Sequence, residues 1–212
     1  MPDWKKLIEG KIALAKRGNT TSKPSTNARI PSGQRQVSNF PILDLGVKPW
    51  IGTQEWKLRI YGLVEKEVEL DWAAFKNLPQ INDISDFHCV TRWTQLDMSW
   101  QGVRVRDILT LAQPLEKARF ATMHGHDGYT TNLPIEALLD DDVLVAHSVF
   151  GDLLTKDHGG PARMIVPKRY AWKGAKWLKA IELHEHDKRG FWEVRGYHNE
   201  ADPWLEQRFS DD

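Results

Sequence analysis

The chain has 212 residues, and its 29 lysines and arginines balance 29 aspartates and glutamates, so its formal net charge is zero. With 41% hydrophobic residues and ten tryptophans it can bury the core of one globular domain, while the neutral charge argues against nucleic acid or an anionic membrane as the main partner. No apolar run approaches the roughly 20 residues of a membrane span, no export signal is visible, and a single cysteine favours the cytoplasm.

Near the N-terminus, apolar residues recur at helical spacing over positions 4–15, with lysines elsewhere on the helical wheel. This spacing predicts an amphipathic helix of about four turns that packs on its own domain, with membrane or partner docking as the alternative. Residues 18–49 are rich in Ser, Thr, Asn, Gly and Pro but keep isolated apolar anchors, which predicts an extended, docked arm. We therefore expect residues 1–28 to form a helix and arm, and residues 29–208 the main domain.

The alternation of residues 56–61 predicts a strand with one buried face, which residues 68–70 continue in the same sheet. Asp71 is placed to cap a helix over 72–77, and Pro79 closes it. Further along we expect a turn at 100–103, helices at 105–112 and 134–139, and strands at 118–124, 143–147, 163–166 and 181–184. Short strands and helices in no regular βα alternation indicate an α+β domain.

The only cysteine, Cys89, lies in the stretch Ser-Asp-Phe-His-Cys-Val-Thr-Arg-Trp at residues 85–93. A lone cysteine can be a buried small hydrophobe, a reactive thiol or a metal ligand. The neighbours Asp86, His88 and Arg92 are polar, which argues against a cysteine that only fills space in the core. This stretch is therefore the first candidate for a functional site.

The histidines allow two further hypotheses. His124 and His126 would point to one side of an extended segment, a spacing that zinc sites use, with Cys89 or His88 as further ligands. The sequence has no Cys-x-x-Cys and no His-Glu-x-x-His to support zinc. A cysteine–histidine hydrolase built on Cys89 is the other hypothesis.

A second informative region combines His-Gly-Gly-Pro-Ala-Arg at 158–163 with Trp-Lys-Gly-Ala-Lys-Trp at 172–177. Its glycines let the backbone approach a ligand closely, and the lysines beside Gly174 could hold a phosphate together with backbone N–H groups. There is no Walker or dinucleotide glycine fingerprint. One alternative is a solvated basic loop with tryptophans in the core. Another is a surface for single-stranded nucleic acid, with bases stacked on Tyr170, Trp172 and Trp177.

Five motifs follow one another along the chain: the cysteine stretch, Trp-Gln-Gly-Val at 100–103, Asp-Gly-Tyr at 127–129, and the two segments just described. In this order they resemble the sulfite oxidase-like molybdopterin oxidoreductases, in particular their short, soluble prokaryotic branch. The resemblance runs from about Arg29 to Arg208. It implies a mixed-sheet, sulfite oxidase-type molybdopterin-binding domain with short helices, and an enzyme that catalyses two-electron oxygen-atom transfer.

The resemblance also implies roles for individual residues. Cys89 would bind molybdenum beside the dithiolene of one molybdopterin, Arg92 would draw an oxyanion towards the metal, and Tyr129 or Tyr197 would donate a hydrogen bond. The implied contacts to the cofactor are Gln34, Arg35, His88, Cys89, His124, His158, Arg163, Lys173, Gly174, Ala175 and Lys176.

Three departures from the family pattern shape the expected function. No haem or dimerisation domain follows, so electrons would pass between a small-molecule substrate and an external carrier. The twin-arginine signal of periplasmic methionine-sulfoxide reductases is not visible. Thr91-Arg92-Trp93 differs from the arginine-rich stretch of sulfite oxidases, which leaves sulfite, an S-oxide or an N-oxide as substrates. The alternative function is a non-catalytic domain that keeps the fold and binds a pterin or nucleic acid through residues 168–179.

Overall fold

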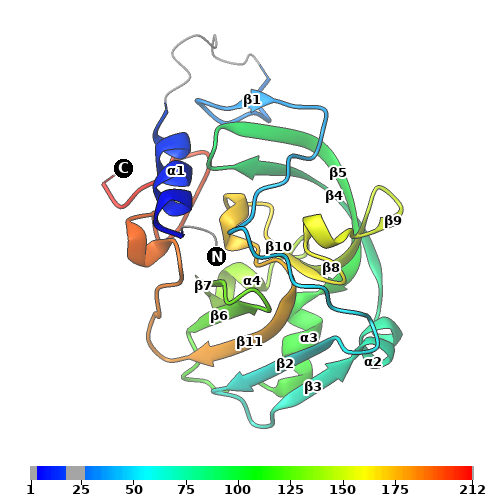
Figure 1. Cartoon of the computed structure of the whole chain (residues 1–212). Helices are drawn as coiled ribbons and strands as arrows, with labels where there is room; N and C mark the ends of the chain where they lie inside the picture. Colours follow the sequence, from blue (N-terminus) through cyan, green and yellow to red (C-terminus); the bar gives the residue numbers. More distant parts are fainter. Residues whose placement is uncertain (1–3, 18–26, 212) are drawn as a thin grey trace.

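Two mixed sheets carry the fold in the computed structural model, which describes residues 4–17 and 27–211 (Figure 1). The first sheet runs β1-β5-β8-β10, with β4 also paired to β5 and β9 to β8. Its strands are β1 (Arg35–Gln36), β4 (Ile81–Cys89), β5 (Trp93–Arg104), β8 (Leu144–Val149), β9 (Asp152–Leu153) and β10 (Arg163–Ile165). The second sheet runs β3-β2-β11-β6-β7. Its strands are β2 (Lys57–Gly62), β3 (Val68–Asp71), β6 (Phe120–Gly125), β7 (Thr130–Pro134) and β11 (Leu178–His184).

Both sheets contain one parallel pair, β1 with β5 and β2 with β11, among otherwise antiparallel neighbours. The helices are short, as expected for an α+β domain. They are α1 (Trp4–Lys16), α2 (Trp72–Asn77), α3 (Val105–Ala112), α4 (Ile135–Leu138) and the 3₁₀ turns η1 (Lys156–His158), η2 (Ala171–Lys173) and η3 (Glu193–Arg195). Asp71 caps α2 as predicted, its carboxylate accepting the Ala74 N–H at 2.8 Å.

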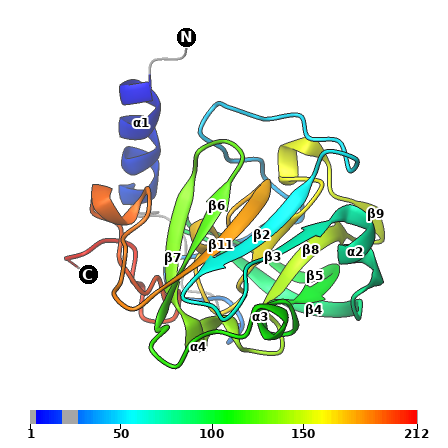
Figure 2. The ribbon, with the colours of Figure 1, turned by 90° about the horizontal axis from the view of Figure 1, so that it is seen from below.

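Helix α1 packs on its own domain. Ala15 is buried, and Trp4, Leu7, Ile8 and Ile12 pack against the core. Figures 1 and 2 both show α1 beside η3 and the C-terminal segment, at the edge of the molecule. No helix in residues 4–17 or 27–211 is long and apolar enough to cross a membrane.

The arm that follows α1 is extended, and of the described residues 27–56 only β1 is a strand. Residues 18–26 of the predicted arm lie outside the described residues. From β1 the arm runs across the middle of the view in Figure 1 before it enters β2. The division of the chain at residues 28 and 29 stays a prediction.

The predicted turn at residues 100–103 is wrong, because this segment continues β5, with a bulge between Gln101 and Gly102. Gly102 is required by a close approach rather than by a turn. A Cβ at this position would collide with the carbonyl oxygen of Val145 on β8. Strands β1, β4, β5, β7 and β9 were not predicted. Strand β4 mixes apolar residues with Asn, Asp and Ser and is buried only at its last residues.

Candidate functional site

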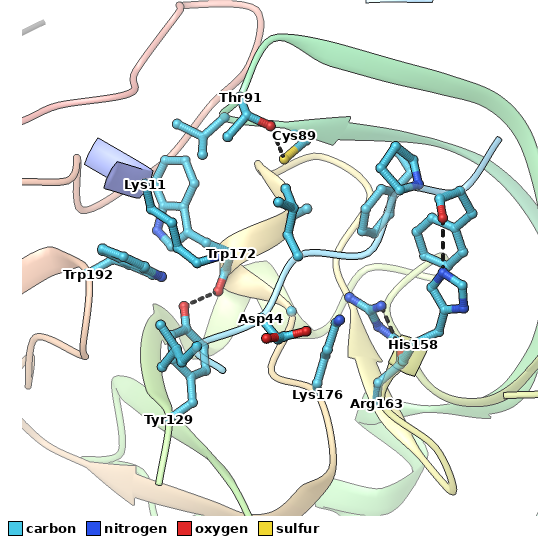
Figure 3. Close-up of a pocket in the computed structure, with 18 of the residues that line it drawn as sticks. Lys11, Asp44, Cys89, Thr91, Tyr129, His158, Arg163, Trp172, Lys176 and Trp192 are labelled. Atoms are coloured by element: carbon cyan, nitrogen blue, oxygen red, sulfur yellow. Dashed lines mark hydrogen bonds between the residues drawn. The ribbon is translucent and has the colours of Figure 1, made fainter. Parts of the chain in front are cut away.

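A pocket of about 860 Å³, open solvent at its mouth included, gathers residues from α1, the arm, the end of β4 and the loops after β6, β9 and β10 (Figure 3). Aromatic side chains form much of its wall, among them Trp172, Trp177 and Trp192. A concave, largely apolar site with a few convergent polar groups is typical of a cofactor or substrate site.

Cys89 is the last residue of β4, and its thiol faces this pocket. The sulfur lies 3.1 Å from Thr91 Oγ1, and the Cys89 carbonyl accepts the Gln34 side-chain amide at 3.1 Å. Burial raises the pKa of the thiol, while hydrogen bonds from Thr91 and the charges of Lys11 and Lys176 lower it. Burial is the largest of these effects, so the pKa of the thiol is above its usual value, and a bound metal ion would be needed to favour the thiolate.

Arg163, on β10, is buried in the wall of the pocket. Its Nη1 donates to the His158 carbonyl at 3.0 Å, and its guanidinium carbon lies 5.4 to 6.0 Å from the ring centroids of Phe40, Phe87 and Trp100. In the part of the chain that the structure describes, its Nε has no hydrogen-bond partner and no carboxylate pairs with it. Burial lowers the pKa of Arg163 to about 10, so the side chain remains charged at neutral pH. An unpaired buried cation is costly, and an anionic ligand would offset that cost.

Lys176 supplies a second cation to the same pocket. Its Nζ donates to the Asp157 carbonyl at 2.7 Å, and burial and the nearby Arg163 charge lower its pKa to about 7. Gly159, with φ of 96°, lies so close that a Cβ there would be 2.8 Å from the Lys176 side chain. An anion bound between Arg163 and Lys176 would favour the charged form of the lysine.

His158 and Tyr129 also line the pocket, but their polar atoms are engaged. The His158 ring stacks on Phe40 at 4.2 Å, with Nε2 3.0 Å from the Phe40 carbonyl and Nδ1 3.1 Å from Thr155 Oγ1. The Tyr129 hydroxyl donates to the Trp172 carbonyl at 2.5 Å. Tyr197 lies on the same wall, and no described residue forms a hydrogen bond with its hydroxyl.

Six of the residues predicted to act at the site line the pocket, and the others lie elsewhere. These six are Cys89, Tyr129, His158, Arg163, Gly174 and Lys176, and Tyr197, which the sequence offered as the alternative to Tyr129, lines the pocket as well. Lys173 is instead completely buried in an ion pair with Glu193, at 2.7 Å, and donates to the Asn132 carbonyl at 2.8 Å. His124 pairs with Glu182 at 2.9 Å across β6 and β11.

His88, next to Cys89 on β4, is buried with Nδ1 2.9 Å from Thr94 Oγ1. Arg92 has a left-handed backbone (φ 69°) and lines a second cleft with Lys16, Glu206 and Arg208.

Three further residues that were predicted to contact the cofactor do not line the pocket. Gln34 is buried and holds the Cys89 carbonyl, Arg35 is exposed on β1, and the Ala175 carbonyl accepts the Met164 N–H at 2.9 Å. Gln34 and Ala175 therefore act on the pocket indirectly, by hydrogen bonds to the backbone of Cys89 and Met164.

The alternatives left open by the sequence find little support. Among residues 4–17 and 27–211 no three His, Cys, Asp or Glu side chains gather as a metal site, and His124 is already paired with Glu182. Tyr170 and Trp177 are fully buried and Trp172 stacks on Tyr170, so these rings do not form a surface for bases.

Two charged residues of the pocket, Lys11 and Asp44, were not predicted from the sequence. Lys11 belongs to a helix whose lysines were expected to face solvent, and Asp44 belongs to the arm. Neither residue has a local sequence signal, because both reach the pocket only through tertiary packing.

A thiol and two cations, the buried Arg163 and the half-buried Lys176, thus share one pocket on two mixed sheets. Residues 45–192 match the family model described as "Oxidoreductase molybdopterin binding domain". The chain therefore belongs to this family, it is an oxidoreductase, and molybdopterin with its molybdenum is its cofactor.

Two related proteins and one solved structure show which members of the family this chain is similar to. The chain is 39% identical over 191 residues to "Uncharacterized oxidoreductase YuiH" of Bacillus subtilis (strain 168), covering 90% of this chain and 96% of that protein. It is 29% identical over 155 residues to "Protein-methionine-sulfoxide reductase catalytic subunit MsrP" of Gluconobacter oxydans (strain 621H), covering 65% of this chain and 49% of that protein. The crystal structure of the sulfane dehydrogenase SoxCD from Paracoccus pantotrophus shares the fold, with a TM-score of 0.61 and 23% identity over 66% of this chain and 40% of that one.

Proposed function

We propose that this chain catalyses two-electron oxygen-atom transfer at a molybdenum ion bound by Cys89. The observation that carries the proposal is that one pocket is shared by the only thiol of the chain and by two cations. These are the buried Arg163 and the half-buried Lys176, and neither forms an ion pair with a carboxylate among the described residues. This combination supports a ligand with a metal at one end and an anionic group at the other.

The pocket residues fit such a cofactor. Arg163, Lys176 and the backbone at Gly174 would bind the phosphate of the pterin, because charge-assisted hydrogen bonds are stronger than neutral ones. When bound, the cofactor supplies a molybdenum ion that changes oxidation state by two electrons as an oxygen atom is gained or lost.

The protein's own groups orient the reaction. Thr91 Oγ1, 3.1 Å from the Cys89 sulfur, positions the proposed metal ligand. The aromatic wall limits access of water to the metal end. Since Tyr129 donates to the Trp172 carbonyl, we assign it to positioning that loop, and Tyr197 is the better candidate to donate a hydrogen bond to the substrate.

The name of the methionine-sulfoxide reductase relative supports an S-oxide as one substrate class, and the resemblance to sulfite oxidases supports an oxyanion. An external electron carrier and a cytoplasmic location remain part of the proposal.

The test is elemental analysis for molybdenum in protein from a host that synthesises the cofactor. We expect near-stoichiometric metal in the wild type and its loss in Cys89→Ser. The matched control is Val90→Ala, which thins the same wall of the pocket but keeps the thiol. Molybdenum in Cys89→Ser equal to wild type would exclude Cys89 as the ligand, and a wild type without molybdenum despite cofactor supply would overturn the proposed function.

A further inference from the structure

Helix α1 lies outside residues 45–192, which match the family model, yet it contributes Lys11 to the pocket. In Figure 3, Lys11 and Thr91 lie to one side of Cys89, whereas His158 and Arg163 lie to the other. The side of the pocket away from His158 and Arg163 is thus completed by a segment that the family model does not include.

The position of Lys11 on the helix is unusual for a lysine. It stands one turn from Leu7 and one turn from Ala15, so all three share the face that packs on the domain. The other lysines of α1, Lys5, Lys6 and Lys16, are exposed. A lysine in the middle of a packed face costs desolvation, which a ligand at its ammonium group would offset.

The ammonium group of Lys11 has no partner of its own. It forms no ion pair or hydrogen bond with residues 4–17 or 27–211, and the nearby Asp44 lies 3.4 Å from Lys48. Burial lowers the pKa of Lys11, while Asp44 and Cys89 act in the opposite direction. Arg92, the residue that the sequence suggested for attracting an oxyanion, lines the second cleft instead.

We propose that Lys11 binds the negatively charged oxygen of the substrate beside Cys89 and so gives the enzyme its preference for small oxyanions over neutral S-oxides. This inference rests on the proposed function, because the substrate is the molecule that reacts at the metal held by Cys89. The packed position of α1 sets the location of the charge, and the apolar residues around Lys11 limit its freedom to reach solvent.

The test uses molybdenum-loaded protein and sulfate as the probe, because a loaded cofactor already occupies Arg163 and Lys176. Binding is followed by quenching of the pocket tryptophans, with neutral dimethyl sulfoxide as a second probe. Lys11→Gln removes the charge, Lys11→Arg retains it, and Lys5→Gln removes an exposed lysine from the same helix. Molybdenum content is measured for every sample.

We expect Lys11→Gln to weaken sulfate binding at least tenfold, with dimethyl sulfoxide binding and molybdenum content unchanged. Lys11→Arg should stay within about threefold of the wild type, since it keeps a cation at the site, and Lys5→Gln should match the wild type. Equal sulfate binding by Lys11→Gln, no saturable sulfate binding by the wild type, or equal loss of both probes would overturn the inference. Loss of molybdenum from Lys11→Gln would also overturn it, by making Lys11 a cofactor contact, whereas a wild type without molybdenum would refute the proposed function itself.

Discussion

Replacing Lys173 with methionine tests whether this lysine supports the fold or holds the cofactor, as the sequence suggested. Lys173 and Glu193 form an ion pair at 2.7 Å with both side chains fully buried. Glu193 Oε1 also accepts hydrogen bonds from Thr131 at 2.8 Å and from the Trp172 indole at 3.1 Å. Burial lowers the pKa of Lys173, and Glu193 partly offsets this effect.

Methionine preserves much of the volume of the lysine but leaves the Glu193 carboxylate buried without a cation. Breaking a buried pair by removing one partner costs about 3–5 kcal/mol of unfolding free energy. For a chain of this size, that corresponds to a Tm lower by roughly 10 °C. Lys173→Met combined with Glu193→Gln should recover part of the loss, because the second change removes the stranded charge.

Urea unfolding followed by tryptophan fluorescence measures these differences. The control is Lys179→Met, an exposed lysine on β11 whose replacement should change stability by less than about 0.5 kcal/mol. If Lys173→Met unfolds like the wild type but contains no molybdenum, Lys173 is a cofactor contact and the structural interpretation is refuted.

Three further predictions concern single sites. Gly102→Ala should cost at least about 2 kcal/mol, because its Cβ would collide with the Val145 carbonyl, whereas Gly10→Ala in α1, where a Cβ meets open space, should stabilise the protein by about 1 kcal/mol in the same urea assay. Burial and then the charge of Lys76 lower the pKa of His147 to about 4, so the unfolded chain binds the extra proton between pH 6.5 and 4. Stability should fall over that window by up to about 3 kcal/mol, and less in His147→Asn, as equilibrium unfolding at pH 7 and pH 5 would measure. Arg163→Met should lose pterin, measured by fluorescence after denaturation, while the cofactor-free protein becomes no less stable, since the variant lacks an unpaired buried cation. A less stable Arg163→Met with normal pterin content would contradict this role.

The elements that could be predicted are those with local signals. Helix α2 has its cap at Asp71 and its stop at Pro79, and α1 has an apolar stripe that the core then covers. Strand β4 has no such signal, because only its last residues are buried and its pairing register with β5 shifts between Ser85 and Phe87. The glycine at position 102 resembled a turn residue because the neighbouring strand that requires it comes much later in the chain.

The candidate site shows the same limit. The segments around Cys89, His158 and Lys176 can be recognised in the sequence because they combine Cys, His, Gly, Lys and Trp. The fold brings them to one pocket. Lys173 shares the composition of its neighbours but has its partner at Glu193, which no spacing rule connects to it. Lys11 was overlooked for the converse reason, because its helix shows an ordinary amphipathic pattern and only tertiary packing turns this lysine inward.

The cations proposed to bind the cofactor and the lysine proposed to bind the substrate come from different parts of the chain. The cations proposed to hold the cofactor, Arg163 and Lys176, lie within the residues that match the family model, and so does Cys89. Lys11 lies outside them, on a helix held mainly by apolar packing. If Lys11 meets the substrate as proposed, a change on α1 would alter that charge and leave Cys89, Arg163 and Lys176 in place. On this proposal the segment that selects the substrate differs from the segment that binds the cofactor, which would allow a change of substrate without a change of cofactor chemistry.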